Sequence, residues 1–209
     1  MSTEPRTWRG RATRERIVQA AAELVAERGV AGTSLDDVRQ RAHASKSQLY
    51  LYFRDRDDLL RAVTEATCDA VLDLQADVLA RFDSLAGVEH YLDATVALQE
   101  ERNGRGGCPI GSLAGQLAEH NEDARRALAE GFERWEEGLR AGLETMAARG
   151  ELRHDADPST LATQTLSTLQ GGLLLTQVRR DPSQLRIAAD AALALIRSAA
   201  TASTHPAPG

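Results

Sequence analysis

The sequence is poor in aromatic residues and cysteine, and it has no long apolar run. Aromatic side chains make up 4% of the 209 residues, and alternating β-branched stretches are missing, which argues against a β-sandwich or barrel. No apolar stretch approaches the ~20 residues that cross a bilayer, and no apolar segment follows the N-terminal charges as in a secretory signal. We therefore expect a cytoplasmic helical protein without a membrane partner.

Residues for metal or nucleophilic chemistry are also scarce. The histidines stand at positions 43, 90, 120, 154 and 205, and no two of them have the i, i+4 spacing that binds a metal on a helix. Cys68 and Cys108 make no metal pattern and are interpreted as reduced thiols, although their number also allows one disulfide. No Ser-His-Asp arrangement is indicated. We expect no metal, no cofactor and no catalytic residue.

Charge is distributed unevenly along the chain. The net charge is −6, but residues 1–54 hold ten basic and six acidic residues, a balance of +4, which leaves −10 for the remainder. Lys46 is the only lysine, and arginine supplies every other cation. A basic N-terminal part before an acidic remainder suits a DNA-binding head on a body that does not bind DNA.

The stretch 34–53 has the signals of two short helices joined by a tight turn. Ser34 is a suitable N-cap for the first helix. Ser45, followed three residues later by Gln48, forms a capping box, so a second helix begins at about Lys46. Two helices of this size with such a turn predict a helix-turn-helix motif, whose second helix enters the DNA major groove.

The second helix of this motif has side chains suited to DNA. Lys46, Ser47 and Gln48 bring a cation and hydrogen-bonding groups to its first turn, where base contacts are made. Tyr50 and Tyr52 follow, and their hydroxyls can reach phosphates. The alternative is that short helices with serine caps occur in any helical protein. The position of the motif behind an arginine-rich N-terminal arm, which contains Arg6, Arg9 and Arg11, favours DNA binding.

Apolar residues at three- and four-residue spacings predict further helices. They are expected at about 12–28, 55–81, 88–102, 109–120, 122–149, 158–179 and 182–200. Residues 1–10 and 201–209 are expected to be flexible tails. We expect an all-α chain with a three-helix DNA-binding domain at 11–71 and a helical ligand-binding and dimerisation domain at 72–200. The last two helices, 158–200, have more apolar surface than one bundle can hide and are the predicted dimer interface.

A gapless pattern of residues runs through the N-terminal domain. Its members are Ile17, Gly29, Thr33, Ser34, Val38, Ser45, Lys46, Ser47, Gln48, Leu49, Tyr50, Phe53, Arg56, Leu59 and Leu60. This pattern resembles the DNA-binding domain of the TetR (tetracycline repressor) family of bacterial regulators. The chain departs from the family pattern at Arg39, in place of a small alanine, at His43, in place of the turn glycine, and at Ala44, in place of a valine. Arg56 replaces the lysine of the pattern and keeps its charge.

The expected partner is a double-stranded, near-palindromic operator bound by a homodimer, with recognition helices about one helical turn, ~34 Å, apart. Base contacts are expected from Lys46, Ser47 and Gln48, on the helix capped by Ser45. Phosphate contacts are expected from Thr33, Ser34, Tyr50, Tyr52 and Arg56.

The segment 80–195, with Gly-Cys-Pro-Ile-Gly at 107–111, resembles the LmrA/YxaF-like branch of the family. The resemblance implies a response to small aromatic ligands and a four-helix dimer interface. We expect a small hydrophobic or aromatic effector in an apolar pocket, coupled to the head by the helix at 57–80. The expected lining is Tyr91, Gln99, Arg102, Cys108, Ile110, Leu113, Phe132 and Trp135; the alternative is that the aromatic residues simply fill the core.

Together these features predict a ligand-released transcriptional repressor without enzyme activity. The alternative is a helical-bundle carrier or enzyme of small molecules, in which the N-terminal unit serves only structure. The charge asymmetry and the polar first turn of the recognition helix favour the repressor.

Overall fold

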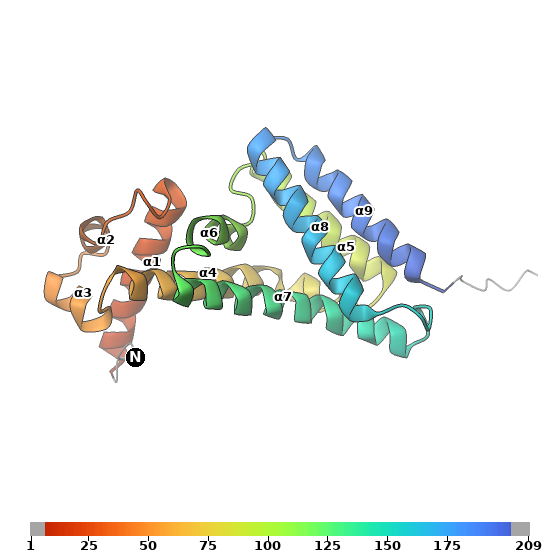
Figure 1. Ribbon diagram of the computed structural model, residues 1–209, viewed down its shortest axis with the longest axis horizontal. Helices are drawn as coiled ribbons and strands as arrows, with labels where there is room; N and C mark the ends of the chain where they lie inside the picture. The colour runs from red at the N-terminus through yellow and green to blue at the C-terminus, as the bar shows by residue number, and fades with distance from the viewer. Residues whose placement is uncertain (1–6, 202–209) are drawn as a thin grey trace, which may run out of the picture. The chain divides into compact units, whose positions relative to one another are not determined.

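The computed structural model describes residues 7–201, which form nine α-helices and one isolated bridge, between Leu152 and Ala200. The helices are α1 (Trp8–Arg28), α2 (Leu35–Arg41), α3 (Lys46–Tyr52), α4 (Arg56–Leu79), α5 (Leu85–Glu101), α6 (Pro109–Leu117), α7 (Glu122–Ala148), α8 (Pro158–Arg179) and α9 (Ser183–Ala199) (Figure 1). The expected all-helical architecture is confirmed. None of the described helices combines the length and the apolar character that a membrane span needs.

The described chain divides into two compact units. Unit 1 contains residues 7–73 and 109–132, and unit 2 contains residues 74–108 and 133–201. The helices α4 and α7 contribute to both units because each crosses a boundary. The sequence-based domains follow chain order, whereas the compact units are discontinuous, since α6 and the start of α7 group with the N-terminal helices.

The head of unit 1, which we define as α1, α2, α3 and the first half of α4, surrounds one apolar core. The core includes Ile17, Ala21, Leu24, Val38, Leu49, Phe53, Leu59 and Val63. The first helix begins at Trp8, earlier than the expected start near Ala12, because the Thr7 side chain accepts a hydrogen bond from the Gly10 N–H, N···O 3.1 Å. Arg9 and Arg11 therefore lie on a helix. Arg6, part of the expected arm, lies outside the described residues.

The turn between α2 and α3 keeps a regular helix-ending geometry although His43 occupies it. The Ala44 N–H donates to the Arg39 carbonyl, N···O 3.0 Å, and the His43 N–H donates to the Gln40 carbonyl, 3.2 Å. This pair of bonds is a Schellman motif. His43 has φ 48°, a left-handed conformation that glycine adopts at lower cost. The departure at His43 thus leaves the motif intact.

Unit 2 is a helical bundle in which α8 and α9 lie side by side and α5 packs against α9 (Figure 1). Gly172 makes the close approach of α8 and α9 possible, because a Cβ there would lie 2.5 Å from the Ala188 Cβ. The neighbouring Gly171 faces open space. The Gly-Gly pair in α8 therefore has one packing member and one exposed member.

Candidate DNA-binding surface

The first turn of α3 presents polar side chains to solvent. Lys46, Ser47 and Gln48 are all exposed, whereas Leu49 is buried and anchors the helix in the head core. The Gln48 N–H donates to the Ser45 Oγ, 3.1 Å, and the Ser45 N–H donates to the Gln48 Oε1, 2.8 Å. This reciprocal capping box confirms the predicted start of α3. The capping box engages the side-chain amide oxygen of Gln48, Oε1, and leaves the side-chain Nε2 to donate to a base.

The two tyrosines of α3 differ in exposure. Tyr50 is 50% exposed, whereas Tyr52 is half-buried and packs against the head core. The Tyr50 hydroxyl is therefore the better placed of the two to reach a phosphate. Tyr52 also contributes its ring to the stability of the head.

The groups expected to hold phosphates at the start of α2 are bonded within the protein. Ser34 accepts from the Asp37 N–H, 3.1 Å, and donates its hydroxyl to the Asp37 carboxylate. Thr33 is buried, and its hydroxyl donates to a main-chain carbonyl of the preceding turn, 2.9 Å. Arg56 donates to the carbonyl oxygens of Val30 and Thr33. The phosphate contacts of these residues stay predictions.

A shallow cavity of about 640 Å³ lies beside this turn in unit 1. It is lined by Ala31, Gly32, Thr33, Ser34, Leu35, Asp37 and Arg56. The hydrogen bond from the Ser34 hydroxyl lowers the pKa of the Asp37 carboxyl, which is therefore ionised at neutral pH. Because the wall contains both this carboxylate and the Arg56 guanidinium, the cavity has no single sign of charge.

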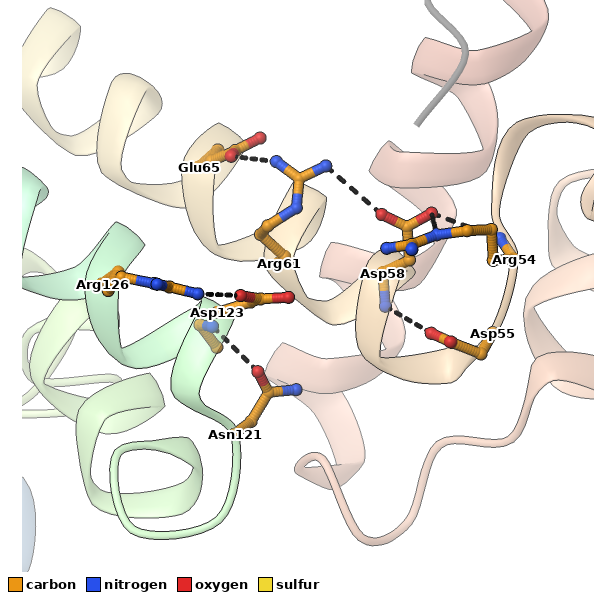
Figure 2. A network of polar contacts seen from close by, with 9 residues as sticks. Arg54, Asp55, Asp58, Arg61, Glu65, Asn121, Asp123 and Arg126 are labelled. Carbon is orange, nitrogen blue, oxygen red and sulfur yellow. Dashed lines mark hydrogen bonds and ion pairs between the residues drawn. The ribbon is translucent and has the colours of Figure 1, made fainter. Parts of the chain in front are cut away.

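A row of ion pairs begins where α3 leads into α4 (Figure 2). The fully buried Asp58 carboxylate accepts from the Arg54 N–H, 3.2 Å, and pairs with the side chains of Arg54 and Arg61, at 3.5 and 3.3 Å. Burial raises the pKa of Asp58, but the bonds from Arg54 and Arg61 outweigh burial, so the pKa lies below its usual range. The charged carboxylate thus fixes the junction between α3 and α4, a role that sequence reasoning missed.

The residues expected to line an effector pocket are divided between the units. Unit 2 contains Tyr91, Gln99, Arg102, Cys108 and Trp135, and unit 1 contains Ile110, Leu113 and Phe132. Six of the eight are buried, whereas Phe132 is half-buried and Arg102 is exposed. Their common role in a pocket stays a prediction. No cluster of three or more potential metal-ligating side chains occurs within residues 7–201.

Gln99 is the polar member of this set with an unsatisfied buried group. It is 2% exposed, and its Nε2 donates to the Gly107 carbonyl, 3.3 Å. Its Oε1 has no hydrogen-bond partner among the described residues. The next residue after Gly107, Cys108, accepts from the Gln170 Nε2, N···S 3.5 Å. An unsatisfied buried acceptor costs about 1–3 kcal/mol, so a donor supplied by a ligand would be favourable at this place in unit 2.

The capped α2, the Schellman turn and the exposed first turn of α3 define a helix-turn-helix DNA-binding protein. Residues 17–63 match the family model described as bacterial regulatory proteins, tetR family. Residues 84–192, more than half of the chain, match the model described as Tetracyclin repressor-like, C-terminal domain. The chain therefore belongs to the TetR family of transcriptional regulators, which confirms the resemblance drawn from the sequence.

Individual relatives agree with this assignment. The chain is 28% identical over 181 residues to an uncharacterised helix-turn-helix regulator of Lactococcus lactis subsp. lactis, covering 82% of this chain and 86% of that one. It is 22% identical over 187 residues to the regulator YxaF of Bacillus subtilis, covering 88% and 95%. The crystal structure of a TetR regulator from Chloroflexus aurantiacus superposes with a TM-score of 0.78 at 25% identity, covering 93% and 98%. These relatives are transcriptional regulators, not enzymes.

Proposed function

We propose that the chain is a cytoplasmic repressor that binds a near-palindromic operator as a homodimer and leaves it when a small hydrophobic or aromatic effector binds. The observation that carries the proposal is the first turn of α3. It presents Lys46, Ser47 and Gln48 to solvent on a helix that a capping box holds in place. Membership in a family of regulators favours this function over a helical-bundle carrier or enzyme.

Selection of operator DNA from random sequence tests the reading surface. A specific site is expected to bind at least about 10³-fold more tightly than random DNA of equal length. Losing an uncharged phosphate contact, as in Tyr50→Phe, should weaken binding to all sequences alike and leave the slope of log affinity against log salt nearly unchanged, because only cationic contacts release counterions. Recovery of no preferred sequence would overturn the proposal that α3 reads bases.

A homodimer is supported by apolar surface on α8 and α9. Leu174 is 59% exposed, Leu175 43%, Val178 72% and Ile187 63%. We call these four residues the α8/α9 patch. The three α8 members share one helix face by their three- and four-residue spacing. These exposed side chains lie on two helices that pack against each other, and apolar side chains gathered in this way favour a contact surface, which a second copy of the chain would cover symmetrically.

Sedimentation of variants tests the dimer. Val178→Glu, within the α8/α9 patch, is expected to give monomers at micromolar concentration because it buries a charge in the interface. Leu74→Glu is the matched control, since Leu74 is 65% exposed and lies on α4. Leu173, also on α8, is unsuitable for this test because it is only 3% exposed, so a charge there would disturb folding rather than the dimer interface. A wild-type protein that sediments as a monomer would contradict the proposal.

The effector proposal is supported by the buried Gln99 acceptor and by the buried apolar residues that precede it on α5, Leu92 and Val96. The helix α4 contributes to both units and would couple effector binding to the head. By linkage, an effector that weakens operator binding must itself bind more weakly, by the same factor, when operator is present. Titrations of aromatic compounds against free protein and against the operator complex measure how much the operator changes the affinity for the compound. Operator titrations with and without the compound measure the reciprocal change.

Gln99→Met tests the assigned acceptor. This variant is expected to bind operator normally and to lose affinity for effectors that carry a hydrogen-bond donor. An effector whose affinity is the same with and without operator would show that its site is not the switch. An unchanged affinity in Gln99→Met would place the donor contact elsewhere.

A further inference from the structure

Both main-chain polar groups of Val30 are bonded by side chains from distant helices. Val30 lies in the segment that joins α1 to α2. Its N–H donates to the Oε1 of Gln116 on α6, N···O 2.8 Å, and its carbonyl accepts from Arg56, the first residue of α4. Gln116 is 86 positions and Arg56 is 26 positions away in sequence. The peptide groups on either side of Val30 are therefore held by long-range contacts within unit 1, together with one local bond from the Thr33 N–H to the Val30 carbonyl, 3.2 Å.

The Gln116 side chain has one defined orientation. Its Nε2 donates to the Ser112 carbonyl on the preceding turn of α6, 3.0 Å, which directs Oε1 toward the Val30 N–H. Gly29 provides the space, because a Cβ there would lie 3.0 Å from the same Oε1. Gly29 also has φ 75°, so both the end of α1 and the space for the Gln116 side chain depend on this glycine.

Arg56 extends the same arrangement to the start of α2. Its Nη2 also donates to the Thr33 carbonyl, 3.3 Å, directly before the N-cap Ser34. Both carbonyls are bonded by this one nitrogen, whose two N–H directions are fixed by the planar guanidinium. The two carbonyls of Val30 and Thr33 mark the beginning and the end of the segment between α1 and α2, so Arg56 fixes where α2 begins.

We propose that Gln116 and Arg56 are positioning residues for operator binding, which hold Val30 by its N–H and by its carbonyl and so set the position of α2 and of the α3 that follows it. This inference rests on operator binding by α3. It assigns the Arg56 guanidinium to the protein's own backbone, in place of the phosphate contact expected from the sequence. It also gives α6 a direct bond to the head.

A pair of variants of equal length tests the Gln116 contact. Gln116→Met removes the acceptor, and Gln116→Glu keeps an acceptor oxygen for the Val30 N–H. Gln116→Met is expected to speed amide exchange at Val30 and to weaken operator binding about three- to tenfold, the factor of one net hydrogen bond, with an unchanged salt slope. Gln116→Glu is expected to restore exchange protection at Val30 and most of the affinity, measured at 0.3 M salt or above to screen the added charge.

Arg56→Lys tests the second contact, because it keeps the charge but replaces the planar guanidinium by a shorter side chain whose ammonium does not keep the same donor directions. Weaker operator binding with an unchanged salt slope is expected, whereas a simple phosphate contact would tolerate lysine. In the double variant Gln116→Met with Arg56→Lys, the fold-losses are expected not to multiply, since both residues hold one segment.

Three results would overturn the proposal. They are unchanged Val30 exchange in Gln116→Met, equal losses in Gln116→Met and Gln116→Glu, and wild-type binding by Arg56→Lys. Melting temperatures exclude unfolding, and Gln116→Ala serves as a second acceptor-free variant. A wild-type protein that binds no operator would contradict the proposed function. Amide exchange at Val30 would still report on the contacts of Gln116 and Arg56 with Val30.

Discussion

The indole N–H of Trp135 donates a buried hydrogen bond to the hydroxyl of Tyr91, N···O 2.8 Å, across 44 residues of sequence. Tyr91 in turn donates to the Gln75 Oε1, 2.9 Å, and the Phe82 ring meets the Tyr91 ring edge to face, with centroids 5.3 Å apart. Burial raises the pKa of Tyr91, so its hydroxyl keeps the proton that it donates. These aromatic residues therefore hold the core of unit 2 together.

Tyr91→Phe tests the strength of this chain of hydrogen bonds. The change leaves the Trp135 N–H and the Gln75 amide oxygen without their bonds to Tyr91, so the free energy of unfolding should fall by about 1–3 kcal/mol. Urea unfolding measures the change. Tyr50→Phe is the matched control and should be neutral for stability, because Tyr50 is exposed. Equal stability of Tyr91→Phe and wild type would show that the bonds contribute nothing.

The glycine pair of α8 gives opposite expectations for one chemical change. Gly171→Ala should stabilise the fold by up to about 1 kcal/mol, since alanine favours a helix and the position is open. Gly172→Ala should destabilise it, because the new methyl group would lie 2.5 Å from the Ala188 Cβ. Thermal unfolding of both variants measures the difference. Similar effects of the two changes would mean that α8 and α9 are not closely packed at Gly172.

His43 has a left-handed backbone conformation, which costs less free energy for glycine and more for β-branched residues. His43→Gly should stabilise the head by up to about 1 kcal/mol, and His43→Val should destabilise it by at least as much, because a β-branched residue fits this conformation poorly. Denaturant unfolding measures both changes. Operator affinity of His43→Gly should match wild type if the side chain makes no DNA contact. A stabilising valine would contradict the turn geometry.

Asp58 makes stability depend on pH in acid. Its folded pKa lies below the unfolded value of about 3.9, so its contribution is present above that value and is lost as pH falls through the folded pKa. Asp58→Asn should lower the free energy of unfolding of unit 1 by roughly 2 kcal/mol or more at pH 7. The difference in this free energy between the variant and wild type should become smaller below about pH 4. The exposed Asp57→Asn is the control. A gap that stays constant from pH 7 to pH 3 would contradict the assigned charge.

The sequence predicted what local signals determine. The Ser45–Gln48 pair marked the start of α3, because a cap needs only residues within one turn. The helix expected at 158–179 begins where predicted, since Asp157 caps it and Pro158 occupies its first turn. The exposed residues of α3, Lys46, Ser47 and Gln48, were also recognisable, because helical periodicity separates them from the buried Leu49.

Contacts between distant residues could not be predicted in this way. Nothing near Gln116 signals its bond to Val30, and the burial of Asp58 depends on how α3 meets α4. Arg56 was expected to face phosphate because its charge is visible in the sequence, whereas its bonds to main-chain carbonyls require the folded turn. Tyr91 and Trp135 were identified as a candidate pocket lining, and only the fold shows that they bond to each other.

The salt dependence of operator binding by Lys46→Met is the most direct test of DNA reading by α3. Lys46 is the single lysine of the chain and is exposed at the first position of α3. We expect Lys46→Met to fold as wild type, to bind the selected operator more weakly, and to lower the salt slope by roughly one unit. The exposed body residue Arg105 provides the control, and Arg105→Met should bind as wild type. Equal affinity and equal slope for Lys46→Met and wild type would contradict the assignment of α3 as the reading helix.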